Sequence, residues 1–201
     1  MNGPDQRRRI QLVDDIADPS RRHFLFDSLN MTLSGTAVAM LAGFPAAVVA
    51  ATHSDARADS DARILNTALA AEREAVAAYG VGAESGLLSA DVLKVAAQFR
   101  GHHQAHAALL DSTIRKLGGT PVEPPASYDF PTDGLRTQAD VLKFAAGLER
   151  GAVSAYAGAI PLFDNRDLSK AAASILSDEA MHWAVLRSAL GLDPVPGAFF
   201  S

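Results

Sequence analysis

Apolar residues recur at helical spacing along most of this chain. From about Asp59 onward their period is close to 3.6 residues, and no segment alternates between apolar and polar as a half-buried strand does. Capping residues, glycines and prolines divide the pattern into four helices. We expect these helices to cover about residues 59–85, 89–117, 137–161 and 166–190. The sequence therefore predicts an all-α protein.

One connection between these helices is much longer than the other two. Residues 120–136 include Pro121, Pro124, Pro125 and Pro131, so we expect an extended segment there. Fully extended, it reaches about 55–60 Å, whereas a helix of about 27 residues is only about 40 Å long. The segment can therefore cross the whole length of a bundle, which makes the second and third helices parallel. The prediction is a four-helix bundle with one long crossover between helices 2 and 3.

Six polar residues interrupt the apolar faces of these helices. Each helix carries a line of positions spaced alternately three and four residues apart, and each line is otherwise mainly apolar. The polar positions are Glu72 on the first helix, His103 and His106 on the second, Glu149 on the third, and Glu179 and His182 on the fourth. Taken singly, each would more often be an exposed charge or a hydrogen-bonded core histidine. Their common phase points to a shared interior site.

The depth of these residues along the bundle also agrees. At about 1.5 Å per residue, those of the first hairpin lie roughly 22–28 Å from its turn, and those of the second lie at a similar depth. Three carboxylates in an apolar core lose hydration at a cost of several kcal/mol per ion, which a bound cation offsets. The sequence thus predicts that all six side chains are metal ligands. His102 stands one position off the apolar line, so we leave it out of the ligand set. Asp178 stands beside a ligand but is expected to face elsewhere, so we assign it no role.

The two predicted hairpins repeat one motif. Residues 72–79, with the pattern Glu-Arg-x-Ala-Val-x-Ala-Tyr, recur as residues 149–156. Such a repeat suggests a pseudo-twofold axis that brings both sets of ligands to one level. Tyr79 and Tyr156 lie two turns beyond their glutamates. We interpret them as core aromatics, with hydrogen bonding to the ligands as the alternative.

Composition restricts the chemistry further. The chain has no Cys, which excludes disulfides, zinc–thiolate sites and iron–sulfur clusters. Carboxylate and imidazole ligands suit iron or manganese, with zinc as another candidate, and we favour iron. The net charge of −5 and the lack of a basic run give no indication of a nucleic-acid partner. A length of 201 residues leaves room for one domain and an appendage.

The appendage is predicted to be an export signal covering residues 1–58. Residues 20–25, Ser-Arg-Arg-His-Phe-Leu, resemble the twin-arginine export motif, and an uncharged stretch follows at residues 28–52. An Ala-x-Ala cleavage triplet lies at residues 56–58. A retained membrane anchor is the alternative, because about 24 uncharged residues can span a bilayer. Both alternatives place the bundle, residues 59–201, outside the cytoplasm, for example in the bacterial periplasm.

With these motifs, the chain resembles the ferritin-like superfamily over residues 59–192, and in particular its exported members that carry a twin-arginine signal and have no assigned function. The resemblance implies two iron or manganese ions, held by Glu on helices 1 and 3 and by Glu-x-x-His on helices 2 and 4. Glu72, Glu149, Glu179, His182 and His106 match that pattern. His103 stands where the family has a Glu that bridges the metals. Three carboxylates in place of four make a single ion an alternative to two.

The functional prediction follows from this site and this resemblance. We expect a metal-binding ferritin-like protein with a di-iron or mono-metal carboxylate/histidine site, acting in iron oxidation or oxidative-stress protection outside the cytoplasm. One alternative is metal binding or storage without turnover. Another is a structural or membrane-tethered helical bundle that serves as a partner subunit. A homo-oligomer is compatible with each of these, and the sequence does not choose between them.

Overall fold

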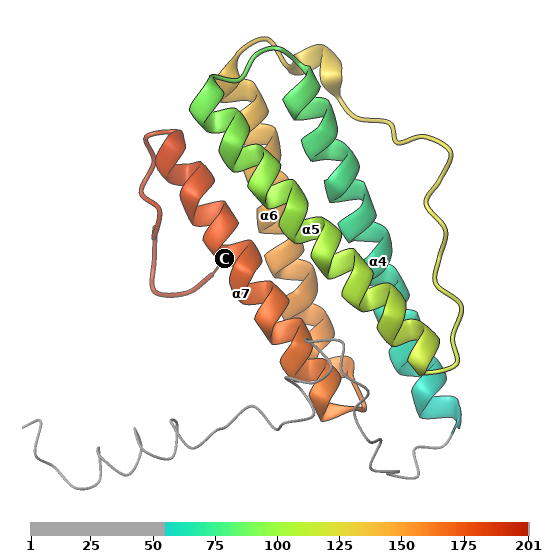
Figure 1. The fold of residues 1–201 in the computed structure, drawn as a ribbon. Coiled ribbons are helices and arrows are strands. Elements are labelled where there is room, and N and C mark those ends of the chain that lie inside the picture. The colour runs from blue at the N-terminus through green and yellow to red at the C-terminus, as the bar shows by residue number, and fades with distance from the viewer. Residues whose placement is uncertain (1–54, 201) are drawn as a thin grey trace, which may run out of the picture.

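The computed structural model describes residues 55–200, which form a bundle of four long helices (Figure 1). These are α4 (Asp55–Glu84), α5 (Ala90–Lys116), α6 (Gln138–Ala159) and α7 (Arg166–Ala189), with the short 3-10 helices η1 (Thr132–Gly134) and η2 (Ile160–Leu162) on either side of α6. Residues 55–200 contain no strand, and the prediction of an all-α four-helix bundle is confirmed.

The start of the bundle differs from expectation. Helix α4 begins at Asp55, ahead of the expected start near Asp59, so it includes the Ala-x-Ala triplet of residues 56–58. The rest of the predicted export signal lies outside the described residues. Within residues 55–200, no helix combines the length and the apolar character needed to cross a bilayer.

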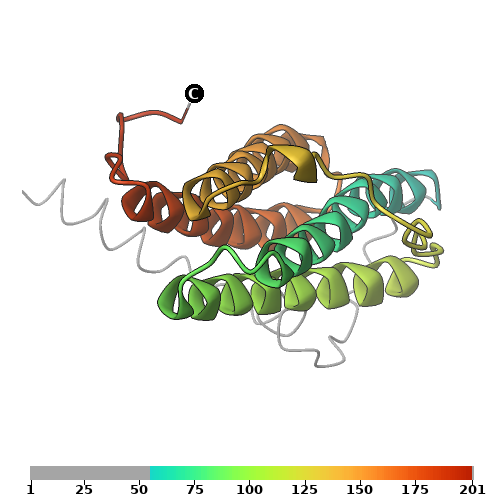
Figure 2. The same cartoon turned by 90° about the horizontal axis from the view of Figure 1, so that it is seen from above.

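The crossover sets the topology of the bundle. In Figure 1, α4 and α5 form an antiparallel hairpin, and the segment after α5 returns along the outside of α4 before α6 begins. Helices α5 and α6 therefore run in the same direction, as the length of the crossover predicted. Figure 2 shows the α4–α5 hairpin packed against the α6–α7 hairpin.

Two side chains of α4 hold the crossover in place. The Asn66 side chain donates a hydrogen bond to the Thr120 carbonyl (3.0 Å) and accepts one from the Val122 amide (2.6 Å). About two turns further on, Arg73 donates to the Val122 carbonyl and forms an ion pair with Asp111 of α5 (3.1 Å). The extended segment is thus fixed through its backbone groups, which a segment rich in proline leaves without helical partners.

Local sequence signals define the later helix ends. Thr137 caps α6 by accepting a hydrogen bond from the Asp140 amide (3.2 Å), and the Asp140 carboxylate accepts one from the Thr137 amide (2.9 Å). This is the predicted capping box. At the other end of the bundle, buried Asp61 accepts hydrogen bonds from the amides of Asp164 (2.9 Å) and Asn165 (3.0 Å). Asp61 therefore joins the first turns of α4 to the start of α7.

Two apolar clusters fill the bundle, one on each side of the level of the predicted ligands. The first consists of Leu65, Leu69, Leu110, Ile114, Tyr156, Phe163, Leu168, Ala172 and Ile175. The second consists of Tyr79, Phe99, Leu142, Ala145, Ala146 and Leu186. Because the apolar lines of all four helices face inward, the polar residues that interrupt those lines are carried into the interior with them.

Candidate metal centre

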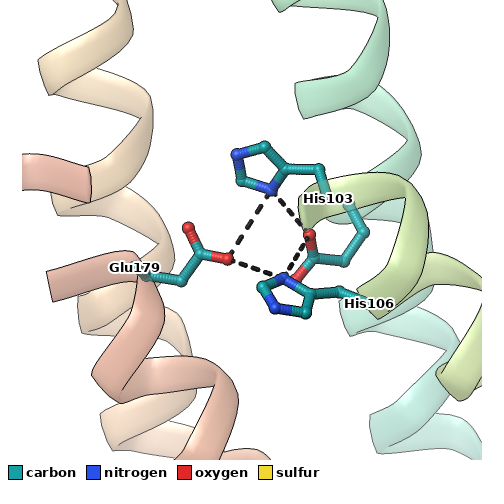
Figure 3. A group of neighbouring side chains, drawn as sticks. His103, His106 and Glu179 are labelled. Carbon is teal, nitrogen blue, oxygen red and sulfur yellow. Dashed lines mark hydrogen bonds and ion pairs between the residues drawn. The ribbon is translucent and has the colours of Figure 1, made fainter. Parts of the chain in front are cut away.

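One polar cluster lies between the two apolar clusters, and each of the four long helices contributes to it. We call this polar cluster the metal centre. Its members are Glu72 from α4, His103 and His106 from α5, Glu149 from α6, and Glu179 and His182 from α7. The His106 side chain is 14% exposed, and the other five are 3% exposed or less. Figure 3 shows His103 and His106 facing Glu179 across the bundle. The structure thus brings all six predicted ligands together.

One half of the centre joins α4, α5 and α7. Nδ1 of His103 lies 2.8 Å from Oε2 of Glu72 and 3.6 Å from Oε1 of Glu179. Nδ1 of His106 lies 3.0 Å from the same Glu179 oxygen and 3.5 Å from the same Glu72 oxygen. These four donor atoms all lie within 4.8 Å of one another, which is the spacing of ligands around one ion.

The other half joins α5, α6 and α7. Oε1 of Glu149 lies 3.3 Å from Nε2 of His103 and 3.5 Å from Nδ1 of His182. The same His182 nitrogen lies 3.5 Å from Oε2 of Glu179. His103 and Glu179 therefore belong to both halves, and each presents a different atom to each half.

His103 limits how the two halves are filled. A bridging carboxylate has lone pairs for two ions, whereas a neutral imidazole has one lone pair and binds one ion. The two ring nitrogens of His103 point to opposite halves, so the neutral ring serves one half at a time. This is the structural consequence of a histidine, in place of a bridging glutamate, at position 103.

Two tyrosines connect the two helical hairpins, each donating a hydrogen bond to a glutamate of the other hairpin. Tyr79 of α4 donates a hydrogen bond to Oε1 of Glu149, and Tyr156 of α6 donates one to Oε1 of Glu72 (2.6 Å). Both rings are buried in the apolar clusters, so their interpretation as core aromatics holds for the rings. Their hydroxyl groups take the alternative role, because each orients a candidate ligand of the other hairpin.

The structure adds two residues that the sequence pattern left out. Oδ2 of Asp178 lies 3.4 Å from Nε2 of His106, 3.3 Å from Nε2 of His182 and 3.0 Å from Nδ1 of His102. Our expectation that Asp178 faces away from the ligands is therefore wrong, and His102, although outside the predicted ligand set, lies against Asp178 and His182 at the edge of the centre. Both stand one helical turn before a predicted histidine ligand, and residues four apart share a helix face. That spacing is the signal that could have identified them.

Protons balance the charge of this cluster when no metal is bound. Burial lowers the pKa of His103, but hydrogen bonds to Glu149 and Glu72 outweigh it and raise the pKa to about 10. The pKa values of His106 and His182 are raised to about 9, because contacts with glutamates likewise outweigh burial. Burial raises the pKa of Glu72, yet its histidine partners lower it to about 2. At neutral pH the metal-free centre therefore pairs imidazolium with carboxylate.

The donor set nevertheless fits a metal ion. Among residues 55–200, buried side-chain atoms of the centre that form no hydrogen bond are Nδ1 of His106, Nδ1 of His182, Oε2 of Glu149 and both carboxylate oxygens of Glu179. Several of them lie within ion-pair distance of one another, yet no hydrogen bond joins them. Buried polar groups without a hydrogen bond are rare and costly, and a shared cation would satisfy them together.

A groove between α4 and α6 leads to this centre. It has a volume of about 240 Å³, and Glu72 and His103 are among its lining residues. Small residues form much of the remaining wall, namely Ala71, Ala75, Gly147, Gly151, Ala152 and Ala155. A water molecule occupies about 30 Å³ in the liquid, so the groove has room for molecules of that size. The groove therefore reaches two of the candidate ligands from between α4 and α6.

Comparisons with known proteins agree with this architecture. Residues 60–192 match the model of a family described as a ferritin-like domain. A conserved hypothetical protein from Mycobacterium tuberculosis has a similar structure, with a TM-score of 0.61 and 23% identity over 70% of this chain and 97% of that one. A ferritin-like, diiron-carboxylate protein from Bacillus anthracis strain Ames has a TM-score of 0.56 and 21% identity over 69% of this chain and 99% of that one. At these identities the likeness establishes the fold. No curated protein matches the sequence.

Proposed function

Since the chain belongs to the ferritin-like domain family, we propose that it binds iron at the metal centre and acts in iron oxidation or oxidative-stress protection outside the cytoplasm. The observation that carries this proposal is the convergence of six carboxylate and imidazole side chains from four helices, five of them buried and His106 partly buried. Their mixture of oxygen and nitrogen donors suits iron, and manganese and zinc are the competing ions.

In this proposal, the residues of the metal centre have different roles. Glu72, Glu149 and Glu179 supply the negative charge, while His106 and His182 supply imidazole nitrogens at the two halves of the centre. Iron held there supplies redox chemistry toward dioxygen or peroxide. The groove between α4 and α6 admits such small molecules, and the apolar clusters keep bulk water from the rest of the interior.

Metal analysis of the full chain, purified without chelator, is the primary test. Two iron or manganese ions per chain support a dinuclear site, and one ion supports a site limited by His103. Absence of metal, together with thermal unfolding that excess chelator leaves unchanged, contradicts the proposal.

Catalysis needs a separate measurement. Ferrous iron added in air should be oxidised faster by the wild-type chain than by a variant with Glu149→Gln and His182→Gln. Both changes remove ligands from the same half of the centre. Gln104→Ala is a matched control, because Gln104 is exposed on α5 beside the centre. Equal oxidation rates in all three proteins would show that turnover does not occur at this site.

One observation favours a non-catalytic alternative. In the metal-free centre, protonated histidines and the two tyrosines already pair with the carboxylates. A structural or membrane-tethered bundle that serves as a partner subunit would therefore not need metal for its fold. Retention of the wild-type fold and partner binding in the Glu149→Gln and His182→Gln variant would support this alternative.

The location outside the cytoplasm rests on the twin-arginine pattern of residues 20–25. Replacing Arg21 and Arg22 with Lys in a bacterium that has this export route should leave the protein in the cytoplasm. Sequencing the N-terminus of the wild-type exported protein distinguishes a cleaved signal from a retained anchor. Unchanged export of the double-lysine variant would refute the proposed route.

A further inference from the structure

A second group of potential ligands lies beside the metal centre, between α5 and α7. Nδ1 of His102 is 2.9 Å from Nε2 of His182 and 3.0 Å from Oδ2 of Asp178, and the last two atoms are 3.3 Å apart. These three atoms form a compact triangle. Neither His102 nor Asp178 belongs to the six predicted ligands.

The triangle has the dimensions of three ligands around one ion. Nitrogen and oxygen donors bind zinc at about 2.0–2.1 Å, so two donors on the same ion lie about 2.9 Å apart at a right angle and about 3.4 Å apart at a tetrahedral angle. All three measured distances, 2.9, 3.0 and 3.3 Å, fall in that interval. An ion on one face of the triangle would need little movement of the side chains.

Exposure falls steadily across this triangle. The His102 side chain is 38% exposed, the Asp178 side chain 23%, and the His182 side chain 2%. An aqueous ion can therefore meet His102 and Asp178 first, while keeping part of its water shell. His182 stands at the inner side of the triangle, and its other ring nitrogen faces Glu149 and Glu179 of the metal centre.

We propose that His102, Asp178 and Nε2 of His182 form an outer site that captures a divalent transition-metal ion and passes it to the metal centre. The outer site is a binding site in its own right, and the transfer rests on the proposed function of the centre. Because neutral imidazole has one lone pair, His182 binds an ion through Nε2 or through Nδ1, not both. When the ion moves inward, the ring proton moves from Nδ1 to Nε2, where Asp178 accepts its hydrogen bond.

Cobalt(II) is a suitable probe, because its binding can be followed by absorption. In the His102→Gln variant of the full chain, the metal centre should fill more slowly, by about 10-fold or more, which is the scale of losing a ligand or its partner. The final content of the metal centre should stay that of the wild type. Gln104→Ala controls for a neighbouring change on the same helix. Filling of the His102→Gln variant at the wild-type rate overturns the outer site.

A second variant separates metal binding from hydrogen bonding. The chain has no Cys, so His102→Cys introduces its only thiol. Nδ1 is the ring nitrogen nearer to the backbone, and the longer zinc–sulfur bond, about 2.3 Å, makes up part of the difference in side-chain length. We expect a cobalt–thiolate absorption band early in loading. The His102→Gln variant could fill slowly while the His102→Cys variant shows no such band. That result would mean that His102 acts only through hydrogen bonds, and it also overturns the proposal.

These outcomes are distinct from failure of the proposed function. If the wild-type centre takes up no metal but the His102→Cys variant shows the cobalt band, the outer site stands and the proposed function fails. The opposite result is a wild-type centre that fills, both His102 variants that fill at the wild-type rate, and no cobalt–thiolate band in the His102→Cys variant. In that case the proposed function stands and the outer site fails.

Discussion

His103 lies in the middle of the metal centre and carries a charge that the metal-free protein needs. Its pKa of about 10 keeps the ring protonated at neutral pH, between Glu72 on one side and Glu149 on the other. A glutamate at this position would add negative charge and give two ions a bridging ligand. The same residue therefore bears on the stability of the metal-free protein and, in the proposed function, on the number of ions that the centre binds.

Replacing His103 with Glu tests both effects. The metal-free variant should unfold at lower temperature than the wild type, because four buried carboxylates would repel one another with only His106 and His182 left to balance their charge. With iron or cobalt, the number of ions per chain should reach two. His103→Gln serves as the control, since it removes the imidazole without adding a carboxylate. A metal content unchanged from the wild type in His103→Glu would contradict this account.

At the scale of helices, the position of α4 relative to its neighbours is set by few polar contacts. Asn66 and Arg73 hold the crossover, and Asp61 holds the start of α7. These contacts lie toward the outside or the end of the bundle, away from the ligands. They position the helices so that ligands far apart in the sequence reach one level.

Asp61 offers a direct test of this role. Asp61→Ala leaves the amides of Asp164 and Asn165 without their carboxylate acceptor, which should lower the free energy of unfolding by about 1–3 kcal/mol. Asp59→Ala, an exposed change on the same helix, should have little effect. Denaturant unfolding of the metal-free proteins measures both. Equal stability of the two variants would show that the contact at the start of α7 is unimportant.

The groove between α4 and α6 gives a second prediction at this scale. A Cβ atom added at Gly151 would have no neighbouring atom within 4 Å, so the side chain of Gly151→Leu can extend into the groove. The metal centre should then react several-fold more slowly with peroxide, while metal content is unchanged. Gly158→Leu on the same helix is equally unobstructed and lies outside this groove. Both changes should raise helix stability by about 1 kcal/mol at most. A reaction rate unaffected by Gly151→Leu would exclude the groove as the path.

The charge balance of the centre is a property of the whole molecule, because four helices supply it. His103, His106 and His182 have pKa values raised from 6.5 to about 9–10, so the stability they contribute is complete below about pH 6.5 and is lost as the pH rises through 9–10. Glu72 has a pKa lowered from 4.5 to about 2, so its contribution is present above 4.5 and is lost as the pH falls through 2. These groups favour the metal-free fold most strongly between about pH 4.5 and 6.5.

Metal binding should reverse this dependence on pH. Ions compete with the protons on the histidines, so the stabilisation that metal provides should grow as the pH rises from 6 toward 9. Melting temperatures measured in chelator and in excess cobalt test this directly. The metal-free protein should lose stability across that range, and the difference between the two conditions should widen. A constant difference would contradict the raised pKa values of these histidines.

The spacing of apolar, polar and capping residues along the sequence predicts most of the fold. The boundaries of α5, α6 and α7 to within about two residues, the capping box at Thr137 and the inward direction of Glu72, Glu149 and Glu179 all follow from residues within a few turns of one another. Such signals are complete in the sequence, because the backbone fixes the angle between successive side chains. The length of the crossover likewise limits the connection to one that spans the bundle.

Contacts between helices were decided only by the tertiary structure. The crossed bonds of Tyr79 and Tyr156 and the grouping of His102 with Asp178 depend on how far each helix is shifted and rotated against its neighbour. A shift of one residue moves a side chain by about 1.5 Å and turns it by about 100°, which is enough to make or break a ligand contact. The sequence determined by itself which residues enter the interior. Packing of the helices determined which atoms meet there, and thus placed the ring of His182 between Glu149 and Glu179 on one side and Asp178 on the other.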